Sequence, residues 1–148
     1  MKAFLPRSQR FLRSTVVGIP ESRKALRNLS KAAQKGAEKG VKKATKFLLK
    51  ETLKVTPIKT GKLRKSGQTR YTGKGYKKVG KIWFTARYAI YVHEDESKKH
   101  ESPTRSKFLQ ATMWKYRKTT REIVEFEIAK AEYGVRMAKS KYPNLPVR

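Results

Sequence analysis

Apolar side chains recur every three or four residues in the first third of the chain, which predicts one long helix over about residues 20–53. Pro20 and Glu21 suit its first turn, and Pro57 ends it because Thr56 is biased away from helical geometry. The stripe consists of Leu26, Leu29, Ala33, Ala37, Val41, Ala44 and Leu48.

The middle of this predicted helix is built from small residues, including Gly36 and Gly40. An interior glycine costs about 1 kcal/mol of helix stability relative to alanine. Two interpretations are open: the helix bends or frays there, or a second helix packs closely against its backbone.

The segment "VTPIKTGKLRKSG" (55–67) predicts a corner that turns the chain from helix into sheet. We expect Thr60 to cap a single turn over 61–66 and Gly67 to end that turn in a left-handed conformation. Leu63 is the apolar anchor of the turn.

The same segment has a superficial likeness to a phosphate-binding loop at Gly61-Lys62. Such a loop requires a glycine five residues before this pair and a serine or threonine directly after it. Thr56 and Leu63 stand at those positions. The segment therefore predicts no nucleotide site and no cofactor.

A hairpin follows, with β-branched and aromatic residues at 68–72 and 79–86 and a glycine-rich turn between them. Gly73 and Gly75 supply the positive-φ positions of that turn. The segment 87–95 reads as a further strand with a charged end. The aromatic side chains of the hairpin either belong to the core or stack on nucleic-acid bases.

A second long helix is expected to begin at Thr104 or Ser106, to bend or end at Gly134, and to lead into an extended tail over 140–148. The fold class is therefore α+β: two long helices packed on a small, mainly antiparallel sheet. The predicted parts are a basic N-terminal arm (1–19), a single domain (20–134) and a C-terminal extension (135–148).

Net charge is the most informative feature of the composition. The chain has 148 residues, with 38 Lys plus Arg against 11 Asp plus Glu, a net charge of +27. The excess is spread along the whole chain, so it indicates either a solvated basic surface or an anionic partner, nucleic acid or acidic protein. No cysteine is present, and no apolar run is long enough to span a membrane.

The first 20 residues are rich in arginine and serine and contain no acid, as in a mitochondrial transit peptide. We expect instead that this arm is retained and docks on a neighbouring subunit.

The sequence contains few side chains that could form a metal or catalytic site. His93, Glu94, Asp95, His100 and Glu101 lie within nine residues and are metal-ligating types. However, no HExxH motif and no second cluster supports them, and a charged strand end followed by a solvated loop explains them equally. No serine, histidine and aspartate set suits hydrolysis, so we predict no catalytic or metal site.

Three spaced segments, "TPIKTGKLRKS", "ARYAIYVHE" and "KFLQATM", together resemble the tail-completion or head–tail joining family of long-tailed bacteriophages, also labelled minor capsid or putative tail-component proteins. The resemblance spans residues 20–132 and excludes the arm and the tail. The residues that match its pattern are Pro57, Thr60, Gly61, Leu63, Arg64, Tyr88, Ala89, Tyr91, Val92, His93, Glu94, Phe108 and Leu109.

The resemblance implies a structural, non-enzymatic virion protein, assembled in the host cytoplasm. It implies a ring at the neck that joins the DNA-filled head to the tail around the DNA channel. Six copies are expected, with twelve as the alternative. Its partners would be the connector on the head side and the tail terminator or tail tube on the tail side, with no membrane. The alternative is a basic, ribosomal-like or architectural protein that binds nucleic acid without sequence specificity.

Within the first helix, four lysines share one face and are candidates for contact with packaged double-stranded DNA or with an acidic partner. They are Lys35, Lys39, Lys42 and Lys46. Other candidate cations lie in the arm (Arg7, Arg10, Arg13) and around the helix (Lys31, Lys43).

Overall fold

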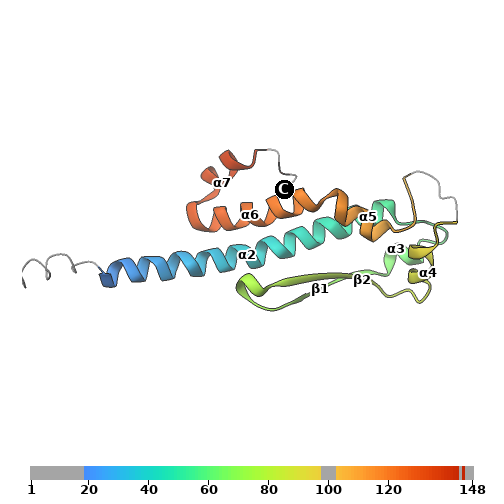
Figure 1. Cartoon of the computed structure of the whole chain (residues 1–148), viewed down its shortest axis with the longest axis horizontal. Coiled ribbons are helices and arrows are strands. Elements are labelled where there is room, and N and C mark those ends of the chain that lie inside the picture. Colours follow the sequence, from blue (N-terminus) through green and yellow to red (C-terminus); the bar gives the residue numbers. More distant parts are fainter. Residues whose placement is uncertain (1–18, 98–102, 144, 146–148) are drawn as a thin grey trace, which may run out of the picture. The chain divides into compact units, whose positions relative to one another are not determined.

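The structure, a computed structural model, describes residues 19–97, 103–143 and 145, and it divides the chain into two compact units, 1–31 and 32–148. The predicted arm therefore lies almost wholly outside the described residues, as do His100 and Glu101. Helix α2 (Ile19–Val55), labelled in Figure 1, contributes residues to both units. In the first unit its side chains from Pro20 to Lys31 are all exposed, including Leu26 and Leu29 of the predicted stripe.

The second unit confirms close helix packing at the small residues of α2. A Cβ built at Gly36 would lie 2.7 Å from the carbonyl oxygen of Glu127, and one built at Gly40 would lie 2.7 Å from the Cα of Val124. Both contacts are with the backbone of α6 (Arg117–Tyr133). Only glycine permits this approach, so the interior glycines are explained by packing.

The predicted second long helix is interrupted at Tyr116. It consists of α5 (Phe108–Lys115) and α6, and it begins at Phe108, later than predicted. The Tyr116 ring packs edge-on against Phe47 of α2 at 5.3 Å, and its hydroxyl donates to Glu51 Oε2 at 3.1 Å. Just beyond, the Thr120 hydroxyl bonds back to the Tyr116 carbonyl, an arrangement that tends to bend helices.

Gly134, with φ of 89°, ends α6, but the chain does not then become extended. Residues Val135–Lys141 form helix α7, so the expectation of an extended tail from Ser140 is wrong at its start. Ala138 is fully buried, and the Tyr142 hydroxyl donates to Glu125 of α6 at 2.9 Å. These contacts with α6 hold the segment in place.

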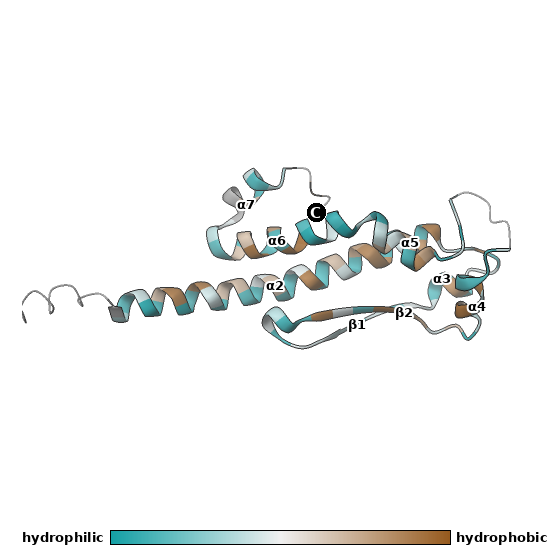
Figure 2. Ribbon diagram, viewed as in Figure 1, coloured by the Kyte–Doolittle hydropathy of each residue, from teal (hydrophilic) through white to brown (hydrophobic). Residues whose placement is uncertain are grey.

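The hairpin is confirmed as β1 (Gly67–Thr72) and β2 (Val79–Phe84), paired antiparallel with a short 3-10 turn, η1 (Gly75–Lys77), at its tip. Gly73 and Gly75 have the expected positive φ. Gly67 and Gly80 approach side chains of α2, so one face of the hairpin packs on that helix (Figures 1 and 2). In the second unit α2 therefore contacts α6 on one side and the hairpin on another.

The predicted strand over 87–95 is wrong, because this segment contains helix α4 (Ala89–Glu94). Among the described residues the sheet has two strands only. Helical spacing brings Ala89 and Val92 to the same side, where both contact the core, and this packing outweighs the β-propensity of the sequence.

Candidate assembly surface at the motif corner

The corner after α2 is built around a left-handed glycine. Gly61 has φ of 73° and directly precedes helix α3 (Lys62–Lys65). Thr60 makes no side-chain cap, and Gly67 lies in β1, paired with Phe84, so the expected roles of Thr60 and Gly67 are wrong. The left-handed residue is needed where the chain enters the turn.

Arg64 ties this corner to the end of α2. Its Nε donates to the carbonyl of Thr56 at 3.0 Å, and its Nη2 donates to the carbonyl of Lys54 at 3.0 Å. The last carbonyls of a helix have no partner within the helix, and a guanidinium can bond two of them at once. Arg64 therefore closes the C-terminal end of α2 and sets the angle of the corner.

The three resembling segments meet in one core. Leu63, Ala89 and Phe108 come from the first, second and third segment, and they form a single buried cluster. The half-buried side chains around it are Val55, Phe84, Ala86, Val92 and Leu109. The matched apolar residues are thus structural, because they hold the corner, α4 and the start of α5 together.

His93 joins α4 to this core. Its ring packs edge-on against Phe108 at 5.0 Å, and its carbonyl oxygen accepts the Lys107 N–H at 2.6 Å. Nδ1 lies 2.8 Å from Glu94 Oε1, whereas the buried Nε2 has no hydrogen-bond partner among the described residues. No group of three His, Cys, Asp or Glu side chains suited to a metal occurs in the described part of the chain.

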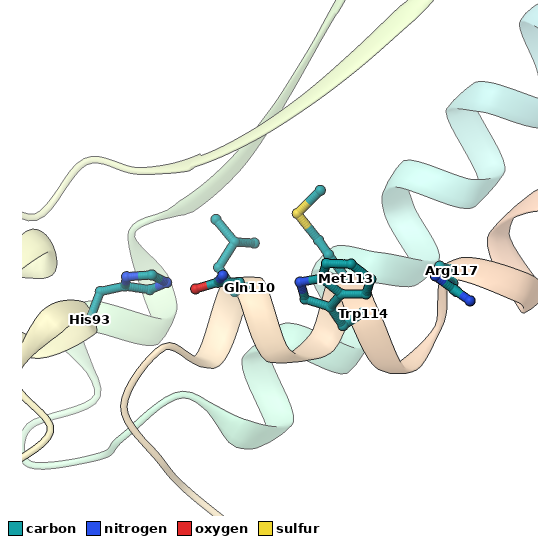
Figure 3. A pocket seen from close by; sticks show the side chains of 6 residues that line it. His93, Gln110, Met113, Trp114 and Arg117 are labelled. Carbon is teal, nitrogen blue, oxygen red and sulfur yellow. The ribbon is translucent and has the colours of Figure 1, made fainter.

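Beside His93 the surface is hollowed into an apolar groove of about 390 Å³ (Figure 3). The groove lies along α5, between His93 of α4 and Arg117 at the start of α6. Its lining residues are His93, Leu109, Gln110, Met113, Trp114 and Arg117.

Large apolar side chains stand exposed on α5, which lines the groove, and on α4, which contributes His93 to it. Trp114 is 64% exposed and Met113 52%, and on α4 Tyr91 is 75% and Ile90 65% exposed. Arg117 lies over the Trp114 ring, 5.6 Å from its centre. An apolar patch on a chain this rich in charge is typical of a protein interaction site. The sequence pattern did not predict this patch, because residues 87–95, which include Ile90 and Tyr91, were expected to form a strand.

A comparison with known protein families gives a match that includes the corner. The family described as bacteriophage HK97-gp10, putative tail-component, matches residues 21–93. Over these residues the chain is similar to the HK97-gp10-like family. No curated protein and no solved structure matches the chain.

The HK97-gp10-like match includes the first two resembling segments, up to His93, and confirms the expected family. Phe108 and Leu109 lie beyond it, so their assignment rests on their packing against Leu63 and Ala89. Among the other matched positions, Pro57 is half-buried, whereas Thr60, Tyr88, Tyr91 and Glu94 are exposed. The residues that match the family pattern are thus of two kinds: some are buried in the core and others are exposed at the surface.

The four candidate lysines of α2 are all exposed: Lys35, Lys39, Lys42 and Lys46. Lys43, one position off this face, instead pairs with the buried carboxylate of Glu127 at 2.7 Å. Among the described residues, no helix is both long and apolar enough to cross a bilayer.

Proposed function

We propose that this protein is a structural part of the phage neck, where copies of the chain form a ring that joins the DNA-filled head to the tail. It acts in the virion, around the DNA channel, and carries out no catalysis. Six copies are expected and twelve are the alternative. Its neighbours are the connector on the head side and the tail terminator or tail tube on the tail side.

The observation that carries this proposal is the apolar surface at the motif corner of a chain from a phage tail-component family. Copies with a net charge of +27 repel one another, so contacts between them need uncharged surface. The groove along α5 and the exposed apolar residues Ile90 and Tyr91 of α4 offer a largely apolar surface. A contact that is not self-complementary closes into a ring when its rotation closes.

Trp114→Glu tests this contact. We expect the purified full-length protein to form a closed oligomer in native mass spectrometry, and the variant to be monomeric but folded, because a carboxylate at the patch centre opposes its burial. Tyr133→Glu is the matched control: Tyr133 is also 64% exposed but lies at the far end of α6, and its change should leave the oligomer intact.

A wild-type protein that stays monomeric at all concentrations, and in assembled particles, contradicts the ring. A monomer that binds duplex DNA tightly supports the architectural nucleic-acid-binding alternative instead.

A further inference from the structure

We propose that the β-hairpin over residues 67–84 binds the phosphate backbone of double-stranded DNA through its outward face and its tip, without reading the sequence. The hairpin contains five cations and no acidic residue. The five are Arg70, Lys74, Lys77, Lys78 and Lys81. Protein surfaces usually mix both signs of charge, so a segment with cations alone suits a ligand with anions alone.

The strand register places two of these cations directly opposite each other. Arg70 pairs with Lys81 across the ladder, and both side chains are exposed on the face that points away from α2. Like charges at directly opposed positions destabilise a sheet. The arrangement becomes favourable when an anion lies over the pair, as a phosphate of DNA would.

Polar side chains flank this pair on the same face. Gln68 lies two residues before Arg70 and Thr72 two residues after it, and both are exposed. Their amide and hydroxyl groups can donate hydrogen bonds to phosphate oxygens. The outward face of β1 is therefore a row of donors and cations.

The tip carries the other three cations in a fixed conformation. The N–H of Gly75 donates to Oε1 of Glu38 on α2 at 2.6 Å, which ties the tip to the helix. The Gly75 N–H lowers the pKa of Glu38, and the charges of Lys78, Lys42 and Lys74 lower it further, so this carboxylate stays ionised. One carboxylate thus faces several lysines, and the local excess of positive charge remains.

The hairpin also lies beside the lysine face of α2. The Tyr71 hydroxyl is 3.5 Å from the carbonyl oxygen of Lys42, and Lys42 belongs to the exposed row with Lys39 and Lys46. At the tip, Lys74 and Lys78 and the α2 residue Lys42 are therefore close enough together to act on the same carboxylate, that of Glu38. This inference deepens the proposed function, because a ring around DNA needs a surface that contacts DNA.

The test measures binding of the full-length protein to a labelled random-sequence duplex of about 30 base pairs by fluorescence anisotropy, over a range of salt concentrations. We expect Arg70→Gln with Lys81→Gln to weaken binding about tenfold at about 150 mM salt and to lower the salt slope by about two. The matched control is Lys118→Gln with Arg121→Gln, which removes one exposed lysine and one exposed arginine from α6. Its binding should change by less than about twofold.

Thermal unfolding separates loss of contact from loss of fold. Removing the opposed cations should leave the midpoint unchanged or raise it, because the repulsion within the hairpin disappears. Equal loss of DNA binding in the hairpin variant and the α6 control overturns the proposal, as does a wild-type protein that does not bind the duplex.

Poly-glutamate serves as the acidic-protein probe in the same assay. If the hairpin variant loses affinity for poly-glutamate as much as for DNA, the surface is one for acidic proteins and the DNA proposal fails. Because oligomer size is measured separately, a missing ring with hairpin-dependent DNA binding refutes the proposed function alone.

Discussion

At the scale of single residues, Arg64 shows how one side chain can set a corner. Its guanidinium bonds the carbonyl of Lys54, in the last turn of α2, and the carbonyl of Thr56, the residue directly after the helix. The neighbouring cation Lys62, in the same short helix, is exposed. Both residues are cations, but only Arg64 bonds carbonyls at the end of α2, so we expect only Arg64 to stabilise the corner.

Arg64→Ala should therefore lower the free energy of unfolding by about 1–3 kcal/mol, since both carbonyls lose a charged donor. Lys62→Ala is the matched control and should change it by about 0.5 kcal/mol or less. Urea unfolding followed by circular dichroism measures both values. Equal effects of the two substitutions would show that Arg64 does not hold the corner.

At the scale of elements, the packing of α2 against α6 depends on the absence of two side chains. A Cβ at Gly40 would lie 2.7 Å from the Cα of Val124, closer than such atoms approach in folded proteins. Because the obstacle is backbone and not a flexible side chain, one helix has to move away. Neighbouring contacts, such as Lys43 with Glu127, would then be strained as well.

For Gly40→Ala we expect destabilisation of about 1–3 kcal/mol, although alanine by itself favours a helix by about 1 kcal/mol over glycine. Lys39→Ala, on the exposed face of the same helix, is the control and should be nearly neutral. Thermal unfolding by calorimetry reports the difference. A variant more stable than the wild type would mean that α2 and α6 are not in close contact.

At the scale of the whole molecule, the net charge opposes both folding and association. With 38 cations and 11 acids, repulsive pairs outnumber attractive ones, so self-repulsion opposes the compact state. Salt screens this repulsion, since the Debye length falls from about 30 Å at 0.01 M to about 8 Å at 0.15 M.

We therefore expect the thermal midpoint of the purified protein, and the fraction of closed oligomer, to rise when sodium chloride increases from about 0.01 M to about 0.15 M. DNA binding should weaken over the same range, because it releases counterions. Differential scanning fluorimetry, native mass measurement and anisotropy in matched buffers check the three trends. An oligomer that dissociates as salt rises would show that its contacts are ionic, not apolar.

The sequence by itself determined the features that depend on local periodicity and backbone preference. The stripe and Pro57 located α2 to within a few residues, and the glycines of the turn located the hairpin and its positive-φ positions. Leu63 was correctly recognised as the anchor of the corner. The resemblance also identified the family, which the match over 21–93 confirms.

Tertiary structure alone decided the rest, because those features depend on contacts between distant residues. Residues 89–94 form a helix since the core around Leu63 and Phe108 takes Ala89 and Val92 from one side. The break at Tyr116 coincides with its contacts to Phe47 and Glu51, about 65 residues earlier in the chain. The apolar groove depends on the position of α4 beside the start of α5, where the His93 ring packs against Phe108. No local pattern encodes such juxtapositions, since periodicity describes which face of an element is apolar and not what that face meets.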